Sequence, residues 1–169
     1  MTPKAARRLR ILAGAAGVLL VLGVLMAGWY YQRVHASLPQ LDGLATVGGL
    51  SGTVTIERDG QGVPTIRGTD RVDVARALGW LHAQDRFFQM DLLRRSPAGE
   101  LAELFGKRAL PHDREMRRHG FRGIAVNAVA GLPTDQRALL EAYTAGVNAG
   151  LAALGDRPFE YLVLREAPQ

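Results

Sequence analysis

The chain has 169 residues, which suits one domain or part of a larger one, and 47% of them are hydrophobic, as in a globular rather than a disordered protein. Five of its 21 Lys and Arg residues lie in residues 1–41, a stretch without Asp or Glu, so residues 42–169 balance 16 basic against 16 acidic side chains and offer no basic face for nucleic acid. The absence of cysteine excludes disulfides, thiolate metal sites and a thiol nucleophile from this chain.

Residues 1–36 are predicted to be a signal anchor. Basic residues between Lys4 and Arg10 precede an uncharged stretch, residues 11–31, which as a helix would cross a hydrocarbon core of about 30 Å. The stretch ends in Trp29, Tyr30 and Tyr31, and such aromatic residues are typical of a membrane–water interface. The positive-inside rule then places the amino end in the cytoplasm and the rest of the chain outside it.

A cleaved signal peptide is the alternative for this segment. Val34-His35-Ala36 has the small residues of a cleavage site, and cleavage near Ala36 would give a secreted protein. Signal peptides usually have only about 7–15 apolar residues, so the longer stretch here favours an uncleaved anchor. We therefore expect a membrane-anchored protein whose folded part is extracytoplasmic, either periplasmic or at the cell surface.

The folded part is expected to begin after a linker. Residues 37–52 carry Pro and Gly without a helical or strand period, so they are predicted to be a spacer that holds residues 53–169 off the membrane. Residues 53–58 alternate as a half-buried strand does, residues 59–62 supply turn chemistry and residues 63–67 resume extended structure. This pattern predicts a β-hairpin.

Helices are predicted to follow the hairpin. Thr69 or Asp70 would cap a long helix over residues 71–95, and a short helix would cover residues 100–105. Residues 107–120 are expected to form a polar connection, and residues 121–132 a helix.

The last predicted helix starts with Thr134 as its N-cap and runs to Leu154. Its apolar face is predicted from spacings of three and four: Leu140, Tyr143, Val147, Leu151 and Leu154. Residues 158–164 are expected to be a short strand or an extended segment. Together these elements predict an α+β fold.

Two stretches carry a family resemblance. Residues 58–66 read RDGQGVPTI, and residues 79–95 read GWLHAQDRFFQMDLLRR, with GELAELFG at 99–106 just behind. They resemble the start of the A chain in the penicillin-acylase family of N-terminal-nucleophile hydrolases, and the similarity extends over residues 54–164. Thr65 stands where the family often has His, and Trp80 where Tyr is frequent, which leaves the acyl and amine specificity open.

The resemblance implies a precursor that cuts itself into A and B chains. The new N-terminal residue of the B chain, usually Ser, would attack the amide carbonyl of a small N-acylated substrate, with its own α-amino group as base. The implied fold is a four-layer αββα sandwich, of which this chain holds only a part, completed by its own downstream B chain. A structural calcium, found in some members, is possible in the full enzyme. The nucleophile is expected downstream, so no catalytic residue is assigned to this chain.

Five polar side chains on the predicted long helix could carry chemistry: His82, Gln84, Asp85, Arg86 and Gln89. We interpret them as a buried structural network, satisfied within itself, that fixes the helix against the hairpin and the B chain. A catalytic or metal-binding role is the alternative, but the helix offers too few ligands for zinc.

Four further positions are interpreted as ordinary. His112, Asp113 and Glu115 are expected in a solvated loop, and Ser96 has no base near it in sequence, so no nucleophile and no metal site is predicted there.

Two functions remain in competition. The favoured one is the N-terminal part of an acylase that cleaves β-lactam side chains, acyl-homoserine lactones or similar amides. The other is a membrane-anchored interaction module without chemistry. The helices have apolar faces that would be exposed to water without a partner chain. Residues 42–169 on their own are therefore predicted to aggregate or stay molten.

Overall fold

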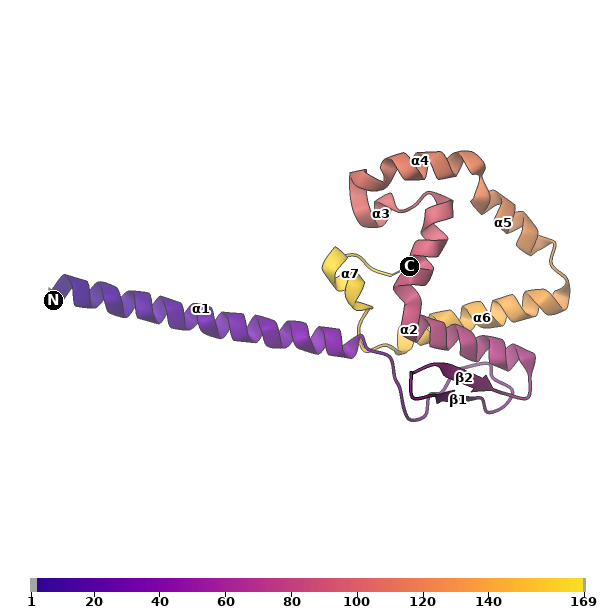
Figure 1. Cartoon of the computed structure of the whole chain (residues 1–169), viewed down its shortest axis with the longest axis horizontal. Helices are drawn as coiled ribbons and strands as arrows, with labels where there is room; N and C mark the ends of the chain where they lie inside the picture. The colour runs from indigo at the N-terminus through magenta and orange to yellow at the C-terminus, as the bar shows by residue number, and fades with distance from the viewer. Residues whose placement is uncertain (1–2, 169) are drawn as a thin grey trace. The chain divides into compact units, whose positions relative to one another are not determined.

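The computed structural model describes residues 3–168 and divides into two compact units, one ending at Ala36 and the other beginning at Ser37. The first unit is a single helix, α1 (Pro3–Ala36), drawn in indigo and violet in Figure 1. From Leu12 to its end this helix is long and apolar enough to cross a membrane, and a signal sequence near the N-terminus would have the same properties. The side chains of Lys4, Arg8 and Arg10, on which the predicted basic region depends, lie outside the described residues.

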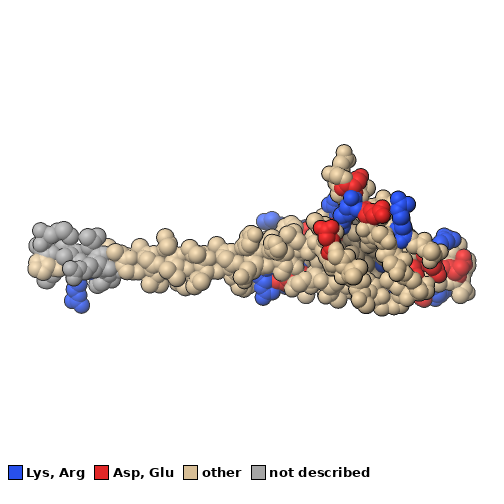
Figure 2. Space-filling view, turned by 90° about the horizontal axis from the view of Figure 1, so that it is seen from below, with Lys and Arg blue, Asp and Glu red and all other residues tan. Residues whose placement is uncertain are grey.

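The exposed surface of α1 is apolar along the middle of the helix, as its sequence predicts. Figure 2 shows an unbroken stretch of uncharged residues along the middle of the helix. Large side chains along it, such as Leu20 and Met26, are more than two thirds exposed. A helix that is apolar on all sides is expected in a lipid or signal-sequence setting rather than alone in water.

The predicted hairpin is confirmed. Strands β1 (Thr55–Arg58) and β2 (Pro64–Arg67) pair antiparallel, with Ile56 opposite Ile66. The turn between them is held by Asp59, whose Oδ1 accepts hydrogen bonds from the backbone N–H groups of Gln61 and Val63 at 2.9 and 2.8 Å. Gly62 takes a φ of 80°, which a residue with a side chain rarely adopts.

The long helix α2 (Arg71–Ala98) is confirmed at its start and extends further than predicted at its end. Asp70 caps it by accepting from the N–H of Val72 at 2.6 Å. The expected end at residue 95 is wrong because the last turn accommodates Pro97, and Gly99, in the left-handed conformation, terminates the helix instead. Arg86 interrupts α2 with φ −143° and ψ 22°, which produces the bend visible in Figure 1.

The segment expected to be a polar connection is helical. After α3 (Ala102–Phe105) and the 3₁₀ turn η1 (Gly106–Ala109) comes α4 (Leu110–His119). Charge placement stabilises α4 where apolar periodicity is missing, because Asp113 lies in its first turn and three basic residues lie in its last.

The remaining elements are α5 (Phe121–Ala130), α6 (Thr134–Ala153) and α7 (Phe159–Leu164). The first two confirm the helices predicted there, although Pro133 rather than Thr134 occupies the N-cap position of α6. The prediction of a strand or extended segment at residues 158–164 is wrong, because α7 forms there around the buried Tyr161.

Glycines bring α2 and α6 into close contact. A Cβ added at Gly146 would lie 1.9 Å from the carbonyl oxygen of Arg76, and one at Gly150 would lie 2.4 Å from that of Trp80. A Cβ at Gly79 on α2 would lie 2.1 Å from the carbonyl oxygen of Tyr143. The buried face of α6 therefore consists of small residues, and the predicted apolar stripe only borders it.

The hydrophobic core lies where α2, α3 and α7 meet. Its buried members are Ala83, Phe87, Leu104 and Tyr161, and partly buried side chains of α2, α6 and α7 pack around them. The described residues are mostly helical with one two-stranded sheet. Two strands cannot form the two sheets of an αββα sandwich, so the expected sandwich would need strands from elsewhere.

Candidate functional site

Asp85 joins α2 to the hairpin. Both of its carboxylate oxygens accept from Nη2 of Arg58 at 2.9 Å, and Nη1 of Arg58 donates to the carbonyl oxygen of Gly62 at 3.1 Å. About a fifth of each charged side chain is exposed. The pair thus connects the middle of α2 to the end of β1 and to the turn that follows it.

Gln84 joins three segments at one buried point. Its Nε2 donates to the carbonyl oxygen of Gly150 on α6 at 2.6 Å, and its Oε1 accepts from the N–H of Gln40 at 2.9 Å. Because the side chain is only 6% exposed, both halves of its amide need partners, and both have them.

The other members of the predicted set behave differently. His82 Nδ1 lies 3.0 Å from Tyr143 Oη of α6, while Arg86 and Gln89 are exposed. Burial raises the pKa of Tyr143, which keeps its hydroxyl neutral. The prediction that the five side chains satisfy one another is wrong, because His82 and Gln84 bond to α6, Asp85 bonds to β1, and the other two face solvent.

The segment predicted to be a linker is tied to the same helix. Asp73, in the first turn of α2, accepts from the backbone N–H and the hydroxyl of Ser51 and from the N–H of Gly52 at 2.7–3.1 Å. The hydrogen bond from the Ser51 hydroxyl is the main reason why the pKa of Asp73 lies below its usual value. Together with the contact of Gln40, these bonds fasten residues 40–52, here called the strap, along α2.

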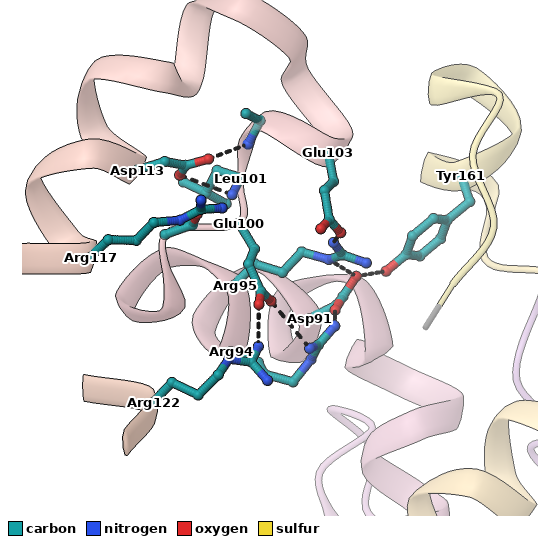
Figure 3. Close-up of polar contacts among 12 residues, drawn as sticks. Asp91, Arg94, Arg95, Glu100, Leu101, Glu103, Asp113, Arg117, Arg122 and Tyr161 are labelled. Carbon is teal, nitrogen blue, oxygen red and sulfur yellow. Dashed lines mark hydrogen bonds and ion pairs between the residues drawn. The ribbon is translucent and has the colours of Figure 1, made fainter. Parts of the chain in front are cut away.

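A second polar network surrounds Asp91 (Figure 3). This carboxylate is 2% exposed and accepts from Arg94 at 2.6 Å, from Nε of Arg95 at 2.8 Å and from the hydroxyl of Tyr161 at 2.6 Å. Arg95 is 1% exposed and also bonds to Glu103. This network connects α2, α3 and α7.

The pKa values in this network reflect its hydrogen bonds. Burial by itself would raise the pKa of Asp91, but the donors Tyr161, Arg95 and Arg94 together lower it below the usual value. Burial and the neighbouring Asp91 carboxylate raise the pKa of Tyr161. At neutral pH the arrangement is therefore a fixed anion held by two cations and a neutral hydroxyl, and it offers no free base.

Asp113 has a structural position rather than the solvated one expected. It is 3% exposed, and its oxygens accept from the N–H groups of Leu101 and Ala102 at 3.0 and 2.7 Å, which caps α3 (Figure 3). Arg117, also on α4, donates to the carbonyl oxygen of Gly99 at 2.8 Å. Glu115 is exposed, as predicted.

His112 lies beside Ser96, a contact that no pattern in the sequence indicates. His112 Nε2 lies 3.0 Å from Ser96 Oγ, although 16 residues separate them. An activated serine also needs an orienting group on the histidine and donors for an oxyanion. Within the part of the chain that the structure describes, no carboxylate bonds to the other ring nitrogen, so the contact holds α4 against α2.

The described side chains that could bind a metal are not grouped together either. Among residues 3–168, as far as their side chains are described, no group of three or more His, Asp or Glu side chains could hold a metal ion. The described polar groups therefore support packing between elements and do not assemble a nucleophile, a base and an oxyanion site.

Comparisons with known proteins give these contacts a context. The family model for penicillin amidase matches residues 53–169. The chain is 41% identical over 138 residues to the penicillin acylase 2 proenzyme of a Pseudomonas species, covering 82% of this chain and 18% of that protein. It is 35% identical over 162 residues to the acyl-homoserine lactone acylase QuiP of Pseudomonas putida, covering 89% of this chain and 20% of that protein.

A solved structure is also similar. The thermostable penicillin G acylase from Alcaligenes faecalis superposes with a TM-score of 0.61 and 29% sequence identity, over 69% of this chain and 64% of that one. The chain thus spans about a fifth of the length of the curated relatives that it matches, but about two thirds of this solved chain.

Proposed function

Because the chain belongs to the penicillin amidase family, we propose that it is the N-terminal part of a larger enzyme that hydrolyses N-acyl amide bonds. The observation that carries the proposal is the family match, which takes in the hairpin and all the helices that follow it. The relatives are named for β-lactam and acyl-homoserine lactone substrates. Both substrates are small amides with an acyl group on nitrogen, and that is the substrate class we assign.

Maturation by self-cleavage is part of the proposal. One relative is called a proenzyme, and this chain covers only 18% of it. The structural match covers 69% of this chain and 64% of the solved Alcaligenes chain, which is therefore a much shorter polypeptide. This difference supports a long precursor that is cut into chains, with the present residues in the A chain and the nucleophile at the start of a B chain.

The chemistry follows from a new N-terminus. The hydroxyl of the first B-chain residue, expected to be Ser, would transfer its proton to its own α-amino group, whose pKa of about 7.7–8.0 allows it to accept one near neutral pH. The oxygen would attack the amide carbonyl, and the amine would leave with that proton. Water would then hydrolyse the acyl ester, which releases the carboxylic acid and restores the serine.

The present residues would contribute position rather than reacting atoms. Asp85 and Gln84 hold the hairpin, the strap and α6 to one helix, so the surfaces that meet the B chain have a fixed geometry. A structural calcium, which some members of the family contain, is possible in the full enzyme. The apolar α1 would anchor the enzyme in the membrane with its folded part outside the cytoplasm, or serve as its export signal.

The non-catalytic interaction module is not favoured. Such a module would not need similarity to acylases throughout residues 53–169. No described contact favours it over the enzyme.

The test is to produce the full-length protein and incubate it with an N-acylated β-lactam and, separately, with an N-acyl homoserine lactone. We expect two chains on a denaturing gel, and release of the free amine and the carboxylic acid from at least one substrate. Sequencing the second chain from its amino end identifies the nucleophile, and its replacement by Ala should stop hydrolysis. An uncut protein that hydrolyses neither substrate would refute the proposal.

A further inference from the structure

The dipeptide Asp-Gly occurs twice in the chain, at Asp42-Gly43 in the strap and at Asp59-Gly60 in the turn of the hairpin. All four residues are exposed among the described residues. When glycine follows aspartate, the backbone nitrogen of the glycine can attack the side-chain carboxyl carbon, because no Cβ on the glycine hinders the approach. Since the two dipeptides are identical and equally exposed, their contacts decide how readily each one reacts.

The carboxylate of Asp59 is held in place by its turn. Its Oδ1 accepts from the N–H groups of Gln61 and Val63 at 2.9 and 2.8 Å. The N–H of Asp59 donates to the carbonyl oxygen of Val63 at 3.1 Å, and the N–H of Gly62 donates to that of Asp59 at 2.9 Å. Moving the carboxyl group onto the nitrogen of Gly60 would break the first two of these bonds, and opening the turn would break the others. The turn therefore hinders ring closure at Asp59.

The carboxylate of Asp42 has no such restraint. Among the described residues no hydrogen bond reaches it or the N–H of Gly43, although the strap is fastened to α2 on either side of the pair, at Gln40 and at Ser51. Gly43 takes a φ of 103°, so the backbone of the strap itself favours the glycine that permits the attack.

A neighbouring side chain also favours the reaction at Gly43. Nε2 of Gln40 donates to the carbonyl oxygen of Asp42 at 3.0 Å. A hydrogen bond to a peptide oxygen draws electrons from the peptide nitrogen, because hydrogen bonds polarise the groups that they join. The amide of Gly43 therefore gives up its proton more readily, and a nitrogen without its proton is the attacking group.

We propose that Asp42 is a site of spontaneous isomerisation to isoaspartate, and that the turn protects Asp59 from the same reaction. The nitrogen of Gly43 bonds to Cγ of Asp42, and the hydroxyl of the carboxyl group leaves with the amide proton as water, which closes a cyclic imide. Water then adds to one of the two ring carbonyls. Addition at Cγ restores aspartate, whereas addition at the former main-chain carbonyl breaks its bond to nitrogen and gives isoaspartate.

The product changes the strap and leaves the hairpin as it is. In isoaspartate the backbone runs through Cβ and Cγ, so it is one carbon longer between Gln40 and Ser51, where the strap is fastened. The oxygen that accepts from Gln40 becomes part of a free carboxylate. The net charge is unchanged, because one carboxylate replaces another.

Incubation of the full-length protein in water enriched in ¹⁸O tests the proposal. Each passage through the imide adds one labelled oxygen, and peptide mass spectrometry locates it. The peptide that contains Asp42 should gain label at least fivefold faster than the peptide that contains Asp59, and fragmentation by electron transfer should show isoaspartate at residue 42. Equal rates, faster labelling at Asp59 or an unlabelled Asp42 would overturn the proposal.

Unfolding and one substitution provide the controls. In concentrated urea Asp59 loses its hydrogen bonds, so the two peptides should gain label within twofold of each other. A fivefold difference that persisted in urea would mean that neighbouring sequence, and not the fold, sets the rates. Asp42→Glu keeps the charge but would need a larger ring, so labelling of this peptide should fall at least tenfold, and unchanged labelling would contradict the assignment. These measurements need no substrate and do not depend on the proposed function.

Discussion

At the residue scale, the most deeply buried charged pair lies outside the run of polar residues that the sequence singles out, His82 to Gln89. Asp91 and Arg95 are almost wholly buried and bond to each other, whereas Arg86 is exposed in the middle of the family motif. The sequence could place Asp91 and Arg95 four residues apart on a helix, but it could not bring Tyr161 to them. Charged residues of the same helical motif therefore differ in whether they connect elements of the fold or face solvent.

Asp85 and Arg86 provide a direct comparison within that motif. Asp85→Ala removes both hydrogen bonds to Arg58 and should destabilise the full-length protein by about 2 kcal/mol, the size expected for bonds between charged groups that are mostly buried. Loosening the hairpin should also lower the yield of the cut, two-chain enzyme. Arg86→Ala, the neighbouring exposed control, should unfold within about 0.5 kcal/mol of the parent.

Thermal unfolding and the fraction of cut protein on a gel measure the two effects. If Asp85→Ala were cut at the normal yield and lost only the rate of hydrolysis, a structural role for Asp85 would be wrong.

The raised pKa of Tyr161 predicts how the stability of the protein changes with pH. Burial raises its pKa in the folded state above the ordinary value of 10.0, and the hydrogen bond to Asp91 raises it further. Its contribution to stability is fully present below pH 10 and is lost as the pH rises from there, because the unfolded chain releases a proton that the folded chain keeps. Asp91 behaves oppositely: its lowered pKa contributes stability above 3.8 that is lost as the pH falls below that value.

The measurement is thermal unfolding of the full-length protein at pH values on either side of 10.0, with and without Tyr161→Phe. The substitution should cost about 1.5–3 kcal/mol near neutral pH, since it removes a hydrogen bond to a charged group. It should also remove up to about 1.4 kcal/mol per pH unit from the alkaline slope. An unchanged slope in the variant would contradict the assignment.

At the element scale, α2 and α6 can cross closely because glycines lie where their backbones meet. Periodicity predicts a helix at residues 134–154 correctly, because leucine and valine recur at spacings of three and four. It does not predict which face is buried, since Gly146 and Gly150 add nothing to an apolar pattern. Close approach of two backbones is a property of the pair, and neither helix shows it alone.

Gly146→Ala tests this crossing. The new Cβ would meet the carbonyl oxygen of Arg76 at 1.9 Å, so the helices must separate, and we expect a loss of roughly 2 kcal/mol or more in the free energy of unfolding. Gly123→Ala is the control, because Gly123 lies within α5 and has no atom within 4 Å of the added Cβ. That change should be neutral or stabilise the helix by up to about 1 kcal/mol. Equal melting temperatures for the two variants would refute the close contact.

At the scale of the whole molecule, much apolar surface in the second unit lacks cover. All of α5 is exposed among the described residues, including Phe121, Ile124 and Val126. A groove of about 560 Å³ lies between α5 and the end of α2, lined by Pro97 and Ala98 on one side and by α5 on the other. Soluble monomers rarely leave such surfaces open, so they fit a part of a larger protein.

Residues 42–169, produced alone, should therefore aggregate or stay molten. We expect strong binding of a hydrophobic dye, a broad thermal transition and large species in sedimentation, because the hairpin and α5 are both uncovered. The control is the full-length protein in the same buffer, which should melt cooperatively. A monomeric fragment with a sharp transition would show that these residues complete their own core.

The sequence by itself determined the local elements and the family. Turn residues gave the hairpin, Asp70 and helical periodicity gave α2 and α6, and the motif at residues 79–95 gave the resemblance that the family match confirms. These features depend on residues close together in the chain, whose preferences a single sequence records.

Only the tertiary structure decided which side chains hold the elements together. Asp91 with Tyr161, Gln84 with Gly150 and Asp73 with Ser51 are separated by 70, 66 and 22 positions, and their hydrogen bonds form only when the helices have packed. Packing also turned residues 159–164 into α7 and fastened the expected linker to α2. The physical reason is that burial and partner geometry, which set the strength of a polar contact, are properties of the assembled fold.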